Sequence, residues 1–188
     1  MKKLIIAMAA FGLSSVAMAG PSWTYAELDA VFQDDGDDKA KGYEIAGSLA
    51  FGGLFHVNAE YADIDDGAGA DNDLDGYRIA AGIHPAVTDS TDLYAELGYT
   101  SLSADSGQDP DAMDLTFGVR SMITDSVELG AQMRLANGST DAGGADDFQD
   151  SEISLSGQYF FTDALAFRAE ASDNSMELGV RWSFGDIL

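Results

Sequence analysis

Hydrophobic and polar residues alternate along most of this chain with a period of two. The clearest example is the stretch 175–184, which reads S-M-E-L-G-V-R-W-S-F. Successive side chains of an extended strand point to opposite faces, so one face of this stretch is expected to be apolar and the other charged or small. The apolar face holds Met176, Leu178, Val180, Trp182 and Phe184. This pattern is typical of a transmembrane β-strand with lipid on one side and a polar lumen on the other.

The same alternation recurs in ten segments and predicts ten β-strands. They cover residues 24–32, 43–51, 55–61, 77–84, 93–100, 113–120, 127–135, 152–159, 165–171 and 175–184. No charged residue falls on any apolar face, and all five arginines fall on the polar faces. An even strand number also returns both ends of the sheet to one side of the membrane, as bacterial barrels require. We therefore predict an all-β fold, a closed antiparallel up-and-down transmembrane β-barrel.

The connections between these strands are expected to alternate in length. Short ones lie at 52–54, 85–91, 121–126 and 160–164, whereas longer ones rich in Asp and Gly lie at 33–41, 62–76, 101–112 and 136–150. The last connection on the long side, 172–174, is short. Short periplasmic turns and long outer loops are the asymmetry of outer-membrane barrels, so the short set is assigned to the periplasmic side.

Periodicity alone leaves open which face is inside, because a soluble barrel of the fatty-acid-binding kind would alternate with its apolar face inward. Two belts of aromatic residues on the apolar faces favour the membrane, where such belts mark the two interfaces. The outer belt is predicted to contain Tyr43, Tyr61, Tyr77 and Tyr99, and the periplasmic belt Phe51, Phe55, Tyr159, Trp182 and Phe184.

The first 19 residues have the features of a secretory signal peptide. Lys2 and Lys3 precede an apolar run, and Ala17-Met18-Ala19 matches a cleavage site made of small residues. A retained N-terminal anchor is the alternative. We expect residues 1–19 to be removed and residues 20–188 to form one barrel domain, located in the outer membrane of a Gram-negative bacterium.

The chain is strongly acidic, with 33 Asp and Glu against 9 Lys and Arg, and a formal net charge of −24. This balance argues against nucleic acid as a partner and against adhesion to anionic lipid through a basic patch. The chain has no cysteine, so an exported fold must depend on its hydrogen-bond ladder and burial instead of disulfides.

The repeated strand–turn–strand segments also carry a family resemblance. G-Y-R-I-A-A-G-I-H-P-A-V-T-D-S-T-D-L-Y-A-E-L-G-Y (76–99) and F-G-V-R-S-M-I-T-D-S-V-E-L-G (117–130) are examples. With them the chain resembles the small OmpA-like and OmpX-like outer-membrane β-barrel proteins, often labelled porin family. The final strand, with Phe184 as its closing aromatic, is similar to the strand by which such proteins are recognised for assembly. The resemblance implies eight strands as the alternative count.

The chain offers little for catalysis. His56 and His84 are its only histidines, and both fall on the polar face near the predicted periplasmic end. Symmetric pairing about the 62–76 loop would set them opposite each other, where a metal or proton-relay site is conceivable; two hydrated lumen residues are the plainer interpretation. No Ser-His-Asp or Cys-His arrangement is evident, so we expect no enzyme activity.

A weak divalent cation site is the remaining candidate for ligand chemistry. Asp71-Asn72-Asp73-Leu74-Asp75-Gly76 matches the opening of a calcium loop, but Gly82 stands where the loop needs a bidentate Glu. The sequence predicts no cofactor beyond weakly bound Ca²⁺ or Mg²⁺ at Asp71, Asp73 and Asp75. A solvated acidic surface is the simpler interpretation of these aspartates.

The polar faces predict ion pairs inside the lumen. Symmetric closure of the 121–126 turn would set Arg120 opposite Glu128 and Asp114 opposite Arg134. The further lumen residues expected in ion pairs are Arg78, Glu60, Arg168, Arg181, Glu177 and Glu27. A small barrel has little open interior once side chains fill it, so these pairs are expected to plug the lumen.

The sequence therefore favours a structural or surface-interaction protein with a narrow, charge-plugged lumen. A small cation-preferring diffusion channel is the alternative, because carboxylates outnumber arginines on the polar faces. Outer-membrane lipid, lipopolysaccharide and the barrel-assembly machinery are the expected partners, and a monomer is the favoured state.

Overall fold

The computed structural model describes residues 20–35, 38–65, 74–104, 110–140 and 147–184. Eleven strands form a single antiparallel sheet. Their bounds are β1 Tyr25–Asp35, β2 Asp38–Phe51, β3 Phe55–Asp65, β4 Leu74–Ile83, β5 Ala86–Thr88, β6 Thr91–Ala104, β7 Pro110–Thr124, β8 Val127–Thr140, β9 Asp147–Phe160, β10 Leu165–Ala171 and β11 Ser175–Ser183. Within these ranges, no helix has the length and hydrophobicity needed to span a bilayer.

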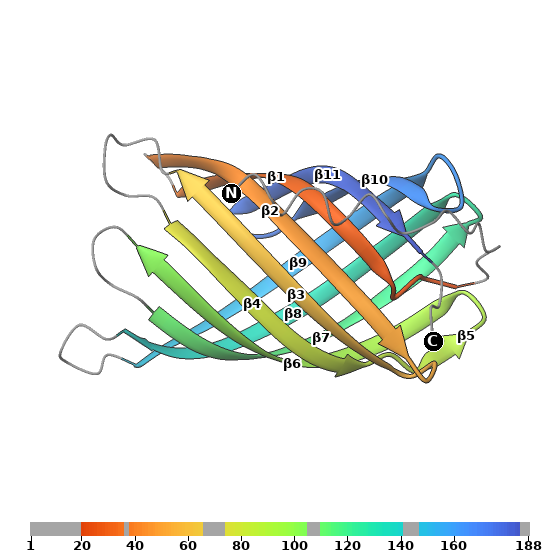
Figure 1. Cartoon of the computed structure of the whole chain (residues 1–188), viewed down its shortest axis with the longest axis horizontal. Coiled ribbons are helices and arrows are strands. Elements are labelled where there is room, and N and C mark those ends of the chain that lie inside the picture. The colour runs from red at the N-terminus through yellow and green to blue at the C-terminus, as the bar shows by residue number, and fades with distance from the viewer. Residues whose placement is uncertain (1–19, 36–37, 66–73, 105–109, 141–146, 185–188) are drawn as a thin grey trace.

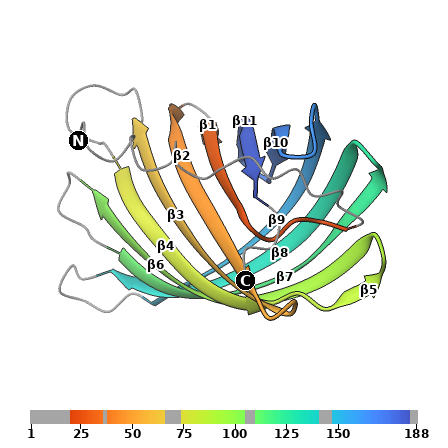
Figure 2. The same cartoon turned by 45° about the vertical axis from the view of Figure 1, so that its right-hand side comes forward.

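The sheet closes on itself as a barrel (Figure 1). The strands follow the order β4-β3-β2-β1-β11-β10-β9-β8-β7-β6, and β4 pairs with β6 to complete the ring. The short β5 pairs only with β6, so it extends one hairpin and does not belong to the wall. The wall therefore has ten strands, which confirms the predicted closed, antiparallel, up-and-down barrel; Figure 2 shows the tilt of its strands.

The inside of the barrel is polar and the outside is apolar. Along β4 the side chains of Tyr77 and Ile79 are exposed, whereas those of Arg78 and Ala80 are buried. Large apolar side chains face outward on every strand of the wall, for example Leu97 with 58% and Leu155 with 62% of their surface exposed. This sidedness excludes the soluble alternative, whose apolar face would be inside.

The strands are longer than the sequence predicts at one end of the barrel. Segments 33–41, 62–76, 101–112 and 136–150 are expected to be loops, but much of each belongs to strands, and β1 and β2 pair as far as Asp35 and Asp38. A β-ladder is held by backbone hydrogen bonds, so it continues past the apolar belt where polar side chains can be solvated. We call this end the loop end, and the opposite end, with the 52–54 turn, the turn end.

The turn end also departs from the expected boundaries. The predicted turn 85–91 contains β5, which makes a small hairpin with the start of β6. The predicted turn 121–126 is mostly strand, because β7 runs to Thr124 and β8 starts at Val127. Thr24, expected on the apolar face of the first strand, precedes β1 and is fully buried, and its Oγ1 accepts a hydrogen bond from the backbone N–H of Ala50 at 3.1 Å.

Candidate functional site: the barrel lumen

The polar faces of the ten wall strands converge on a narrow lumen. The cavity between their side chains has a volume of about 160 Å³, and both arginines and carboxylates line it. A channel for solutes would need continuous open space along the barrel axis, so the contacts across this lumen decide its function.

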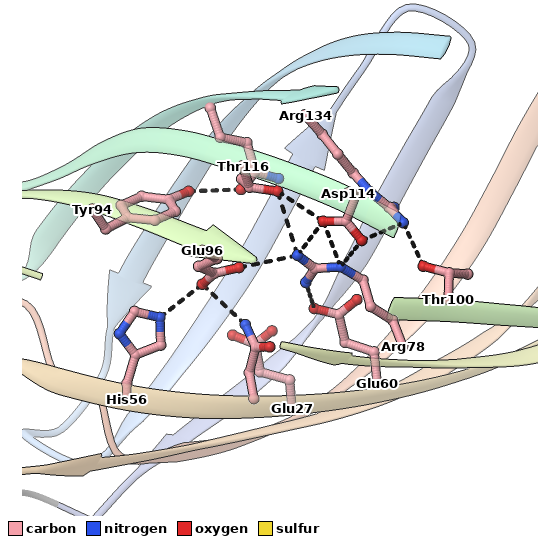
Figure 3. A network of polar contacts seen from close by, with 12 residues as sticks. Glu27, His56, Glu60, Arg78, Tyr94, Glu96, Thr100, Asp114, Thr116 and Arg134 are labelled. Carbon is pink, nitrogen blue, oxygen red and sulfur yellow. Dashed lines mark hydrogen bonds and ion pairs between the residues drawn. The ribbon is translucent and has the colours of Figure 1, made fainter. Parts of the chain in front are cut away.

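Arg78 on β4 is the centre of the first group of lumen contacts (Figure 3). Arg78 is 7% exposed, and its guanidinium donates to three carboxylates from three different strands. The distances are 3.1 Å from Nη1 to Glu60, 3.2 Å from Nη2 to Glu96, and 2.7 Å from Nη2 to Asp114. A planar guanidinium with five donors is suited to such multiple bonding, and each bond to a charged partner is stronger than a neutral one.

This Arg78 network extends toward both ends of the barrel. Toward the turn end, Glu96 Oε1 lies 2.8 Å from His56 Nε2 and accepts a bond from Asn58 at 3.0 Å. Toward the loop end, Arg134 lies 3.4 Å from Asp114 and donates to Thr100 at 2.8 Å. The network therefore joins β3, β4, β6, β7 and β8, which are successive neighbours along one side of the lumen.

Arg168 on β10 is the centre of a second group. It lies 3.0 Å from Asp29, 2.8 Å from Glu177 and 3.6 Å from Glu27, and it also pairs with Glu170. Arg181 on β11 also pairs with Glu27 of β1. The second group therefore joins β1, β10 and β11, which lie opposite the first group in the ring, with β2 and β9 between the two groups.

The Arg120–Glu128 contact forms, although the register predicted for it is wrong. Arg120 Nε donates to Glu128 Oε1 at 2.6 Å, and both residues are buried. In the ladder, however, Arg120 lies opposite Gly130 and Glu128 opposite Met122. The turn closes between Thr124 and Val127, nearer β8 than the centre of the predicted loop, and the ladder is irregular between Met122 and Thr124, so the pairing moves by two residues. Long side chains reach such diagonal neighbours, so the ion pair survives the shift.

The same two-residue offset applies to Asp114 and Arg134. Asp114 lies opposite Ala136 rather than Arg134, yet the two charged groups are in contact at 3.4 Å. The structure thus brings together all ten residues expected in lumen ion pairs. It adds Asp29, Glu96 and Glu170, which the alternation places on polar faces but which the predicted pairs omit.

An aromatic cluster that the sequence analysis overlooks lies in the turn-end half of the lumen. Trp23, in the segment before β1, is 4% exposed. Its ring centroid lies 4.5 Å from that of His56 and 4.6 Å from that of His84, and its Nε1 donates to Asp92 at 2.6 Å. The guanidinium of Arg120 lies over the same indole at 4.5 Å. We call these residues, with the nearby Tyr94, the Trp23 cluster.

The two histidines lie close together without being directly opposed. His56 faces Gly82 in the ladder, and the N–H of His84 donates to the carbonyl of Leu54 instead, yet the two ring centroids are 5.3 Å apart. Among the described residues, no group of three or more His, Cys, Asp or Glu side chains is arranged to hold a metal ion. Both imidazoles contact Trp23, which assigns them to aromatic packing.

Of the three divalent-cation candidates, only Asp75 is among the described residues, and it lies at the loop end. Asp71 and Asp73 are outside the described residues. Asp75 is exposed on β4 and faces Asp63 of β3 across the ladder, and Asp63 accepts a hydrogen bond from the Tyr43 hydroxyl at 3.0 Å.

Both predicted aromatic belts face outward. At the loop end, Tyr43, Tyr61, Tyr77 and Tyr99 are 38–46% exposed. At the turn end, Phe51 stacks on Phe55 and Trp182 on Phe184, each pair with centroids 5.9 Å apart. Tyr159 contacts Phe161 edge-on at 5.4 Å, so the turn-end belt includes one more aromatic residue than predicted.

Carboxylates outnumber arginines inside the lumen. Five arginines face eleven acids: Glu27, Asp29, Glu44, Glu60, Asp92, Glu96, Asp114, Glu128, Glu152, Glu170 and Glu177. Among the described residues the lumen acids exceed the arginines by six in formal charge, a balance that favours cations over anions.

Comparisons with known proteins agree with the fold. No family model matches the chain, and no curated protein matches its sequence. Among solved structures, an outer-membrane channel from Pseudomonas putida F1 aligns with a TM-score of 0.53 at 10% identity, over 91% of this chain and 98% of the other. The fold is therefore that of an outer-membrane β-barrel protein; membership of the OmpA-like or OmpX-like group is not shown by these comparisons.

Two further solved structures align with lower scores. The KdgM porin, solved in complex with disordered oligogalacturonate, aligns with a TM-score of 0.48 at 12% identity, over 85% of this chain and 99% of the other. Neisserial surface protein A aligns with a TM-score of 0.41 at 20% identity, over 87% of this chain and 98% of the other.

Proposed function

We propose that this protein is an integral outer-membrane β-barrel whose lumen is closed by internal charge networks, and that it has a structural or surface-interaction role. The observation that carries the proposal is the position of Arg78, whose single guanidinium projects into the lumen and bonds carboxylates of three neighbouring strands there. Arg168 joins a further set of strands in the same way.

The closure follows from the cost of separating these charges. A buried ion pair that loses one partner leaves an uncompensated charge in a poorly solvated site, at a cost of about 3–5 kcal/mol. Moving Arg78 aside would break its bonds to Glu60, Glu96 and Asp114 together. The side chains that occupy the lumen are therefore held in place by the fold, and we expect the lumen not to open by their movement.

The setting of the barrel is part of the same proposal. The signal-peptide pattern in residues 1–19 and the apolar belt support insertion in the outer membrane of a Gram-negative bacterium. Lipid and lipopolysaccharide would contact the belt, the barrel-assembly machinery would insert it, and a monomer would suffice because the ring of strands is closed. We assign no enzyme activity to it.

A small cation channel is the second candidate. The observation in its favour is the excess of six carboxylates over arginines among lumen-facing residues, a balance that would attract cations to any continuous water path. This candidate needs the networks of Arg78 and Arg168 to leave such a path open.

Conductance in a planar bilayer distinguishes the two candidates. We expect the purified, refolded barrel to insert without discrete current steps in concentrated KCl, because charged side chains occupy its lumen. Insertion is checked independently on the same preparation in vesicles, by the gel mobility of the folded form before and after heating. Steady, reproducible current steps from the folded protein would refute the closed lumen and favour the cation channel.

A further inference from the structure

The segment Gly20–Trp23 enters the barrel although it is not one of its strands. Ser22 and Trp23 are 6% and 4% exposed, while β1 begins only at Tyr25. Trp23 lines the lumen cavity together with Asn58 and Arg120, so its indole bounds that cavity. His56 and Tyr94, which contact this indole, are visible beside the Arg78 network in Figure 3.

The indole lies against groups from three different strands and the β4–β5 connection. His56 is on β3, His84 follows β4, Asp92 and Tyr94 are on β6, and Arg120 is on β7. The two imidazoles lie side by side against the ring, because their centroids are only 5.3 Å from each other. One tryptophan therefore fills the space between strands at the turn-end half of the lumen.

The attachment of this segment differs from that of the strands. The last backbone bond of the ladder at this point joins the Phe184 N–H to the Thr24 carbonyl, at 2.9 Å. Before Thr24 the segment is held by side chains: Ser48 donates to the Trp23 carbonyl at 2.8 Å, and Trp23 Nε1 donates to Asp92. The segment could leave the lumen without breaking a single bond between strands.

We propose that Gly20–Trp23 is a removable stopper that seals the turn end of the lumen, with the Trp23 indole as its sealing group. The proposal rests on the proposed function in one respect, namely that the lumen is closed in the resting protein. The stopper would close the lumen in addition to the charge networks. It differs from them because Gly20–Trp23 lies outside the strand ladder, whereas Arg78 is part of a wall strand. The other residues of the Trp23 cluster hold the indole in place.

A cysteine placed directly behind the stopper reports its position. Asn58 is the next lumen-facing residue of β3 after His56, it is 8% exposed, and the chain contains no cysteine. In the variant Asn58→Cys we expect slow reaction with a charged, water-soluble thiosulfonate reagent. Adding Trp23→Ala is expected to raise the reaction rate at least about tenfold.

The matched control is the other tryptophan of the chain. Trp182 faces outward and stacks on Phe184, so adding Trp182→Ala to Asn58→Cys should leave the labelling rate unchanged. The stopper is refuted if Trp23→Ala gives a folded barrel with an unchanged rate. It is equally refuted if the cysteine reacts at the rate of an exposed thiol while Trp23 is present.

Tryptophan fluorescence tests whether the Trp23 indole is buried inside the barrel, without removing its side chain. The variant Trp182→Phe leaves Trp23 as the only tryptophan. We expect its emission to be quenched by acrylamide several-fold less than in the unfolded chain, and to be insensitive to brominated lipid, because the indole is buried inside the barrel. Quenching equal to that of the unfolded chain, or strong quenching by brominated lipid, would overturn the proposal even if Trp23→Ala fails to fold.

The two proposals can fail independently. Current steps from the wild-type barrel would refute the closed lumen while Trp23-dependent labelling of the Asn58→Cys variant still supported a stopper at one end. A silent wild-type barrel, together with labelling of that variant that ignores Trp23, would leave closure to the charge networks of Arg78 and Arg168 alone.

Discussion

At the scale of single residues, the lumen contains charges that would be costly if they were not paired. Arg120 and Glu128 are both at least nine-tenths buried, and Arg181 Nη1 lies 3.9 Å from the same Glu128 oxygen. The indole of Trp23 also lies under the Arg120 guanidinium, a cation–π contact that strengthens when water is excluded. Arg120 is therefore held by one carboxylate and by the rings of Trp23 and Tyr25.

A charge swap tests this pair. Arg120→Glu should lower the free energy of unfolding by on the order of 3 kcal/mol, because two carboxylates would then face each other in a buried site. Adding Glu128→Arg should restore a large part but not all of it, since the new arginine would lie near Arg181 and the contact with Trp23 would be lost. Urea unfolding in detergent measures both changes.

The control for the swap is a residue with the opposite environment. Lys41 is exposed on the outside of β2, so Lys41→Glu should change the free energy of unfolding by less than about 1 kcal/mol. If the double variant at Arg120 and Glu128 is no more stable than Arg120→Glu alone, the ion pair does not stabilise the barrel.

The sequence could predict which side chains enter the lumen, because the face of a strand residue depends only on its parity. Arg78, Arg168 and Glu128 are assigned inward by this argument, and they are inward in the structure. The parity of Tyr25 and Glu27, extended back by two residues, also points Trp23 inward. The predicted strand begins at Thr24, so the prediction does not include Trp23, and no strand pattern signals that a residue before the first strand packs inside the barrel.

At the scale of strands, neighbouring side chains decide how closely the lumen is filled. Tyr94 of β6 lies directly opposite Gly118 of β7, and a Cβ atom at Gly118 would come within 2.4–2.5 Å of the tyrosine ring. The ring thus lies across the glycine, and its hydroxyl donates to Gln132 at 2.6 Å. A glycine at this position lets an aromatic side chain lie flat along the lumen wall.

Gly118→Ala is therefore expected to destabilise the barrel, because the added Cβ would clash with the Tyr94 ring. The added methyl group should lower the free energy of unfolding by about 1–3 kcal/mol, the usual cost of overpacking. In a Tyr94→Ala background the same change should cost little, because the clashing ring is absent. Equal costs in the two backgrounds, measured as a double-mutant cycle, would contradict the contact.

Periodicity predicts strand ends and registers less well than the strands themselves, for a physical reason. A shift of one residue in pairing turns every side chain to the other face, whereas a shift of two preserves the alternation. The β7–β8 hairpin, which contains Arg120, and the β3–β4 hairpin, whose predicted register would set His84 opposite His56, both differ from the predicted register by two residues. Periodicity cannot detect this change. The ends differ because polar residues continue the ladder beyond the apolar belt.

At the scale of the whole molecule, charge is distributed unevenly between the surfaces of the barrel. The belt of the outer wall between the two aromatic girdles is apolar, the lumen contains all five arginines, and the described lumen acids exceed those arginines by six in formal charge. A field of this sign inside low-dielectric walls concentrates cations at any accessible lumen site and repels anions. The effect should appear in the chemistry of a lumen cysteine even if the barrel carries no current.

The expected outcome is a preference for positively charged reagents. In the variant Asn58→Cys with Trp23→Ala, a cationic thiosulfonate should react at least about ten times faster than an anionic one at low salt, after correction for their rates with a free thiol. The ratio should fall as ionic strength rises. Glu152→Gln, which removes one acid from the cavity lining, should lower it, whereas Asp63→Asn on the outward face of β3 should not. A ratio near one, or equal effects of these two neutralisations, would mean that the ion pairs cancel the field of the lumen and that the acid excess has no role in selecting what enters.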